Sequence, residues 1–174
     1  MQNLVFNIDA LHRAYADGVS PVDVVGECFR RIDAVADPGI FLHLIDVDAV
    51  AAEARSLGTF DPVTKPLWGI PFAIKDNIDA ADAPTTAGCP EFTYIAEKDA
   101  FVVAALRAAG ALLIGKTNLD QFATGLVGVR TPYPFPKNAI DPAIVPGGSS
   151  SGSAVAVSHG IVSFGLGTDT AGSG

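Results

Sequence analysis

The segment GGSSSGSA, residues 147–154, holds four serines and three glycines directly before an apolar run. A serine hydroxyl can attack a carbonyl or pass a proton, and glycine lets the backbone approach a ligand closely. Three interpretations compete for this segment: a flexible linker, a phosphate-binding loop and part of a catalytic centre. The sequence around it decides between them.

A linker is disfavoured because the segment that follows, AVAVSHGIVSFGLG, is apolar and patterned like structured sequence. A phosphate loop has more physical merit, since glycines before a helix expose N–H groups to an anion. It needs partners that are missing, however. The chain has no GxxxxGK[ST] motif, and GLGTDTAGSG carries Thr170 where GxGxxG requires its third glycine.

Two further segments carry residues that could do chemistry. GIPFAIKDNID, residues 69–79, places Lys75 at the end of an apolar strand, and GLGTDTAGSG, residues 165–174, places Ser173 in a glycine-rich turn. Taken singly, a strand-end lysine usually covers apolar surface with its stem, and serines such as Ser149 usually form turns or cap helices. Only their joint occurrence, in this order, favours catalysis.

The elements that must position these residues follow from periodicity and turn signals. Ser20 and Pro21 predict the start of a helix, and Asp99 is expected to cap another. The predicted helices span about 21–35, 48–58, 99–110 and 151–158, with a further one starting near 118–120, and the predicted strands span 41–46, 72–74, 111–114 and 161–166. Residues 59–66 and 130–147 are predicted loops. Helices that alternate with apolar strands indicate an α/β fold.

Composition excludes several classes of function. With 174 residues, 49% of them hydrophobic, and a net charge of -8, the chain is expected to fold around an ordinary core and not to bind nucleic acid. It shows neither a membrane-spanning run nor a signal peptide, which predicts a cytoplasmic protein. Its two cysteines and three histidines (Cys28, Cys89, His12, His43 and His159) are scattered, so we expect no metal site and no histidine-based catalysis.

The three segments together resemble the amidase signature family, whose hallmark is a Ser-cis-Ser-Lys triad. The resemblance covers residues 60–174 and implies an α/β/α sandwich around a mixed sheet, with no metal or organic cofactor. It implies Ser173 as the nucleophile, Ser149 as the proton relay beside an unusual cis peptide, and Lys75 as the base. The separation of 24 positions from Ser149 to Ser173 matches the family's spacing.

The chemistry that the resemblance implies makes physical sense. A lysine with a pKa of about 10.4 is neutral in roughly one molecule in 2,500 at pH 7, but burial at the end of an apolar strand lowers that pKa. The backbone N–H groups of the following turn are expected to stabilise the oxyanion, and Asp169 to brace that turn. Ser150 and Ser151 are expected to start the next helix, and Gly125 either lines the substrate pocket or is a packing glycine. The implied oxyanion donors are Thr170, Ala171, Gly172 and Ser173.

The resemblance narrows to one branch of the family. Ser151, where most relatives carry glycine, and the ending AGSG are similar to the allophanate hydrolases. This implies hydrolysis of the small amide allophanate to ammonia and carbon dioxide in urea degradation, a functional link to a urea carboxylase and a possible homodimer. The alternative is the A subunit of glutamyl-tRNA(Gln) amidotransferase, or another amidase of the family.

The resemblance also implies an incomplete domain. Residues 1–60 are expected to form a mainly helical lead-in, and residues 61–174 the first part of the catalytic core. The rest of the domain, with the groups that bind the substrate carboxylate, is expected beyond Gly174. An inactive fragment is therefore the non-enzymatic alternative.

Overall fold

A mixed four-stranded sheet with the order β1-β5-β2-β6 forms the centre of the protein. The structure is a computed structural model that describes residues 4–174. Strands β2 (Pro71–Lys75), β5 (Leu112–Thr117) and β6 (Phe164–Leu166) run parallel, and β1 (Phe41–Leu44) pairs with β5 in the antiparallel direction. Strand β2 therefore lies between two parallel neighbours, and all five of its residues are buried.

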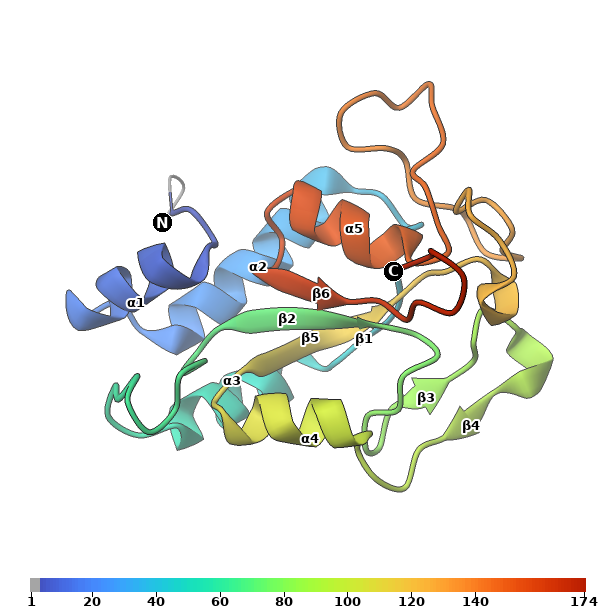
Figure 1. The fold of residues 1–174 in the computed structure, drawn as a ribbon. Helices are drawn as coiled ribbons and strands as arrows, with labels where there is room; N and C mark the ends of the chain where they lie inside the picture. The colour runs from blue at the N-terminus through green and yellow to red at the C-terminus, as the bar shows by residue number, and fades with distance from the viewer. Residues whose placement is uncertain (1–3) are drawn as a thin grey trace.

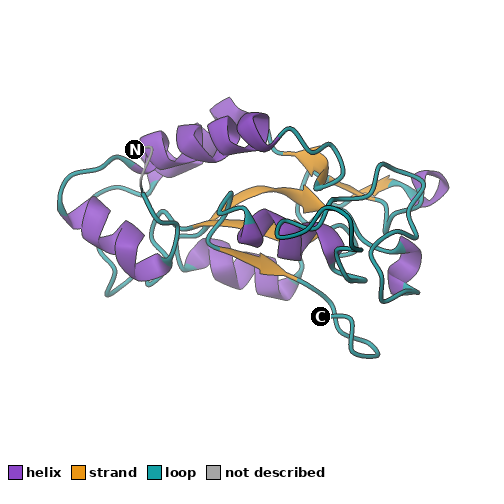
Figure 2. Ribbon diagram, turned by 90° about the horizontal axis from the view of Figure 1, so that it is seen from above, coloured by secondary structure: helices purple, strands orange, loops and turns teal. Residues whose placement is uncertain are grey.

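Helices cover both faces of the sheet, which gives the predicted α/β/α arrangement (Figure 1). On one face, α2 (Pro21–Val35) and α5 (Ser151–Ser158) pack over apolar side chains of β2 and β5. On the other face, α4 (Phe101–Ala108) packs against Phe72, Ile74 and Leu113. Helix α3 (Val47–Ser56) contacts α2 and β5. Figure 2 shows the strands between these helices from a second direction.

Smaller elements complete the fold. Helix α1 (Ile8–Ala16) begins after Asn7, whose side chain accepts the N–H of Ala10, and it was not predicted from the sequence. Strands β3 (Pro84–Thr85) and β4 (Tyr94–Ile95) form an antiparallel pair, and two short 3₁₀ helices span Pro90–Phe92 (η1) and Gln121–Ala123 (η2). Residues 130–147 contain no helix or strand, as predicted.

Most predicted elements are confirmed, including the helices at 21–35 and 151–158 and the strand that ends in Lys75. The predicted strand at 161–166 is shorter, since the N–H of Ile161 donates to Ala156 O at the end of α5. Strand β5 is longer than predicted and reaches Thr117.

Two predictions about helix starts are wrong. Asp99 does not cap α4, because its carboxylate accepts the N–H of Ala81 and pairs with Arg107 instead. No α-helix begins near residues 118–120; the chain forms only the short 3₁₀ helix η2, which follows Asp120. There the buried side chains of Asn118 and Asp120 bond to distant loops, and such bonds compete with a helix for the backbone.

Candidate active site

Lys75 lies at the carboxyl end of the central strand β2 and is fully buried. Its side chain points to the face of the sheet that α5 covers, as does that of its register partner Thr117, which bonds to Ser153 of α5. The Nζ atom of Lys75 donates to Ser149 Oγ at 2.6 Å, to Ser150 Oγ at 3.0 Å and to Thr168 O at 3.2 Å. Three oxygens therefore fix the position of the amine.

Burial changes the acid–base chemistry of this amine. Desolvation lowers the pKa of Lys75 from 10.5 to about 8, against the opposing charges of Asp120 and Asp169. At pH 7 the neutral form then rises to roughly one molecule in ten, from about one in 3,000 for an ordinary lysine. A neutral amine that can accept a proton is thus available near neutral pH.

Ser149 lies between the amine and the second serine. The peptide bond between Gly148 and Ser149 is cis, and the Ser149 side chain is fully buried. Its hydroxyl accepts from Lys75 Nζ and donates to Ser173 Oγ at 2.9 Å. The structure therefore brings the three predicted side chains into one continuous chain of hydrogen bonds.

Ser173 belongs to the turn after β6, and its side chain is buried. Asp169 braces this turn, since its Oδ1 atom accepts the N–H of Gly172 at 2.5 Å and that of Ser173 at 3.1 Å. These backbone bonds hold the pKa of Asp169 below its ordinary value. Asn77, just after β2, supports the same turn by donating to Thr168 Oγ1 at 3.0 Å.

The bracing by Asp169 bears on the expected oxyanion donors. Of the four N–H groups named from the sequence, those of Gly172 and Ser173 donate to Asp169, so in this arrangement they are not free to meet an oxyanion. Thr170 and Ala171 lie in the exposed part of the turn. The expectation of four converging donors therefore does not describe this arrangement of the turn.

Ser150 lies at the start of α5, as expected, but its side chain makes other hydrogen bonds than a helix cap. It occupies the position before α5 but makes no side-chain capping bond. Its hydroxyl accepts from Lys75 Nζ and donates to the backbone carbonyl of Ser173 at 2.6 Å. Ser150 thus links the base to the main chain of the second serine. Its position next to Ser149 was the only sequence signal for this role. Ser151 is the first residue of α5, as expected.

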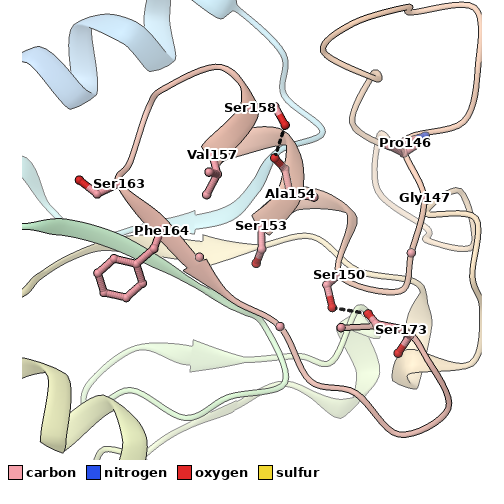
Figure 3. A pocket seen from close by; sticks show the side chains of 14 residues that line it. Pro146, Gly147, Ser150, Ser153, Ala154, Val157, Ser158, Ser163, Phe164 and Ser173 are labelled. Carbon is pink, nitrogen blue, oxygen red and sulfur yellow. Dashed lines mark hydrogen bonds between the residues drawn. The ribbon is translucent and has the colours of Figure 1, made fainter. Parts of the chain in front are cut away.

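A cavity of about 630 Å³ opens beside these serines (Figure 3). Ser150 and Ser173 line it together with residues of α5 and β6, among them Ala154, Val157 and Phe164. The Ser173 end of the hydrogen-bonded chain therefore borders this cavity, whereas Lys75 and Ser149 are not among the residues that line it.

Gly125 is not among the residues that line this cavity. A Cβ atom at position 125 would lie 2.7 Å from the Asp120 carboxyl carbon, so the absence of a side chain there accommodates Asp120. The close approach of Asp120 supports the packing interpretation of Gly125, and a place in the substrate pocket stays a prediction.

The remaining candidates for chemistry lie elsewhere. His12 packs edge-on against Phe60, His43 lies in β1, and His159 follows α5. Cys28 and Cys89 are free. Within residues 4–174, no three His, Cys, Asp or Glu side chains are grouped to hold a metal ion, and no helix is long and apolar enough to cross a membrane.

The chain is similar in sequence to known proteins. The family model named Amidase matches residues 23–174. Urea amidolyase from Saccharomyces cerevisiae is 60% identical over 111 residues, which are 64% of this chain and 6% of that protein. The A subunit of glutamyl-tRNA(Gln) amidotransferase from Nitratidesulfovibrio vulgaris is 43% identical over 155 residues, 87% of this chain and 31% of that protein.

The chain is also similar in fold to solved structures. Selenomethionine-substituted allophanate hydrolase from Kluyveromyces lactis superposes with a TM-score of 0.85 at 41% identity, over 98% of this chain and 28% of that one. This chain thus spans only 6 to 31% of the length of these relatives.

Proposed function

The chain belongs to the amidase family, and on this basis we propose that it supplies the catalytic triad of an amide hydrolase that acts on allophanate. The single observation that carries the proposal is the continuous hydrogen-bonded chain from Lys75 through Ser149 to Ser173, which ends at a cavity. The similarity to urea amidolyase and to a solved allophanate hydrolase supports the choice of substrate.

The proposed reaction starts from neutral Lys75. In the structure Lys75 donates to Ser149, and Ser149 donates to Ser173, as suits a protonated amine. When Lys75 is neutral, both directions reverse: Ser173 donates to Ser149, and Ser149 donates to Lys75. Ser173 Oγ then attacks the amide carbon while its proton passes to Ser149 and the proton of Ser149 passes to Lys75. The relay works because each hydroxyl both donates and accepts.

The proton then returns along the same path. Lys75 gives the proton back through Ser149 to the leaving nitrogen. The C–N bond then breaks, ammonia leaves, and the acyl group remains as an ester on Ser173. Water hydrolyses the ester and regenerates the hydroxyl. We assign the oxyanion to the N–H groups of Thr170 and Ala171. The N–H groups of the next two residues, Gly172 and Ser173, donate to Asp169 instead.

We further propose that residues 1–174 form the N-terminal portion of a longer amidase domain, with a helical lead-in over 1–60 and the first part of the catalytic core over 61–174. The small share of each relative that the chain spans supports this proposal. A urea carboxylase is the proposed source of allophanate, which the similarity to urea amidolyase supports. The homodimer and the cytoplasmic location stay predictions.

The test is ammonia release by the purified full-length gene product. We expect turnover of allophanate to exceed that of glutamine and malonamide, and Ser173→Ala to reduce it at least ~1,000-fold while the circular dichroism spectrum is unchanged. Preference for glutamine, with activity that depends on partner subunits, would assign the amidotransferase function instead. Near-normal turnover by Ser173→Ala would refute the proposed mechanism.

A further inference from the structure

Asp120 is a fully buried carboxylate that the proposed reaction does not use. It lies three residues after β5 and belongs to no helix. Its Oδ1 atom accepts the N–H of Arg130 at 2.8 Å, and its Oδ2 atom accepts those of Gly128 at 2.9 Å and Val127 at 3.2 Å. One side chain therefore gathers the loop 120–130 around itself.

The same residue holds the segment that carries the relay. The N–H of Asp120 donates to the carbonyl of Ser149 at 3.1 Å. Its Oδ2 atom packs so closely on Gly148 that a Cβ atom there would collide with it, as one would at Gly125. The two residues on either side of the peptide bond before the relay hydroxyl therefore both rest on Asp120.

The carboxylate also acts on the amine electrostatically. Two carboxylates raise the pKa of Lys75 and so oppose desolvation. Asp120 has the larger effect, and the exposed Asp169 has the smaller one. The remaining charged pair near the strand end, Asp76 with Lys116, is bonded on the opposite face of the sheet, where Lys116 pairs in register with Ile74. Of the two acidic side chains that act on Lys75, Asp120 is therefore the buried one.

We infer that Asp120 is a positioning residue of the triad: it fixes the backbone of the relay serine through Gly148 and Ser149, and it supplies a buried negative charge toward Lys75. The inference rests on the proposed function. It predicts two separable effects of a substitution, one on the rate when Lys75 is neutral and one on the pH at which Lys75 becomes neutral.

The test compares Asp120→Asn with Asp141→Asn in the full-length gene product. Asp141 is an exposed loop aspartate whose carboxylate also accepts a backbone N–H, that of Ala143. The readout is the rate of covalent labelling by a fluorophosphonate between pH 6 and 10, which requires an activated serine but no particular amide substrate. Allophanate turnover is measured in parallel.

Asp120→Asn is expected to lower the high-pH rate at least tenfold, since the NH2 group that replaces one carboxylate oxygen donates and cannot accept the N–H bonds that this oxygen accepts. It is also expected to move the midpoint of the pH profile below that of the wild type, because the ammonium form loses its neighbouring charge. Asp141→Asn should match the wild type. An unchanged high-pH rate, or a midpoint that stays or moves toward 10, would overturn the inference.

Gly125→Ala covers the case in which Asp120→Asn does not fold. The added methyl group keeps the charge but displaces the carboxylate, and we expect a high-pH labelling rate at least tenfold below that of the control Gly26→Ala, where a Cβ atom meets nothing within 4 Å. Equal rates in the two glycine variants would overturn the inference. If the wild type itself is not labelled at Ser173, the proposed function fails, and the two failures are thereby distinguished.

Discussion

The Nζ atom of Lys75 lies 2.6 Å from the Oγ atom of Ser149, although the two residues are 74 positions apart in the chain. The end of a buried central strand supplies the amine, and the loop before α5 supplies the hydroxyl. Burial of the strand end makes the amine a weaker base, and the hydroxyl connects it to Ser173. This contact therefore connects the buried amine to the proposed nucleophile, Ser173.

The pH dependence of activity follows from this burial. Because desolvation lowers the pKa of Lys75 to about 8, activity is expected to rise with pH and to reach half its maximum near that value. The pH profile of kcat/KM, measured from pH 6 to 10 with a substrate that does not ionise in this range, checks the prediction. A midpoint near 10 would mean that Lys75 is not desolvated in the active protein.

The same pKa has a consequence for stability. The unfolded chain holds the Lys75 proton up to about pH 10.5 and the folded chain only up to about 8, so the contribution of Lys75 to the free energy of unfolding rises with pH between these values. The difference in urea-unfolding free energy between wild type and Lys75→Met, followed over this range, isolates the contribution. A difference that is constant with pH would contradict it.

Ser150→Ala tests the role of the serine next to Ser149. Ser150 accepts from Lys75 and donates to the carbonyl of Ser173, so its loss is expected to lower kcat about 10- to 100-fold with little change in KM. Ser56→Ala is the matched control, since that exposed hydroxyl bonds within α3, to Glu53 O, and does not line the cavity. Equal kcat values for the two variants would show that Ser150 does not help to position the base and the nucleophile.

The buried ion pair on the other face of the sheet is predicted to be a stability determinant. Lys116 Nζ lies 3.3 Å from Asp76 Oδ1, and both side chains are almost fully buried. Lys116→Met leaves the Asp76 carboxylate buried without its counter-ion, which is expected to cost about 3–5 kcal/mol of unfolding free energy.

The double variant Lys116→Met/Asp76→Asn separates charge from packing. Because it removes the unpaired charge, it should recover at least half of the loss in urea unfolding. A double variant less stable than Lys116→Met would show that the charge of Asp76 is not the cause.

The sequence predicts much of this arrangement because two of its signals are local. The apolar run before Lys75 predicts a buried strand, and the start of α5 at Ser151 follows from the serines and glycines before it. The roles of Lys75, Ser149 and Ser173 came from the family resemblance. The structure adds the hydrogen bonds that join them.

The sequence did not predict features that depend on distant partners. Asp99 looks like a helix cap, but Ala81 and Arg107 take its carboxylate. Asp120 looks like the first turn of a helix, but its bonds to the loop 127–130 prevent one. Ser150 looks like a capping residue until Lys75 is placed beside it. In each case a polar side chain has a local role available and a tertiary contact takes precedence.

The most direct test of the central claim is to map the fluorophosphonate adduct by peptide mass spectrometry in wild type and Lys75→Met. We predict an adduct on Ser173 in the wild type, with a labelling rate that rises through a midpoint near pH 8, and a rate at least ~1,000-fold lower in Lys75→Met. An adduct on another serine, or equal labelling of the two proteins, would contradict the proposal that Lys75 activates Ser173 through Ser149.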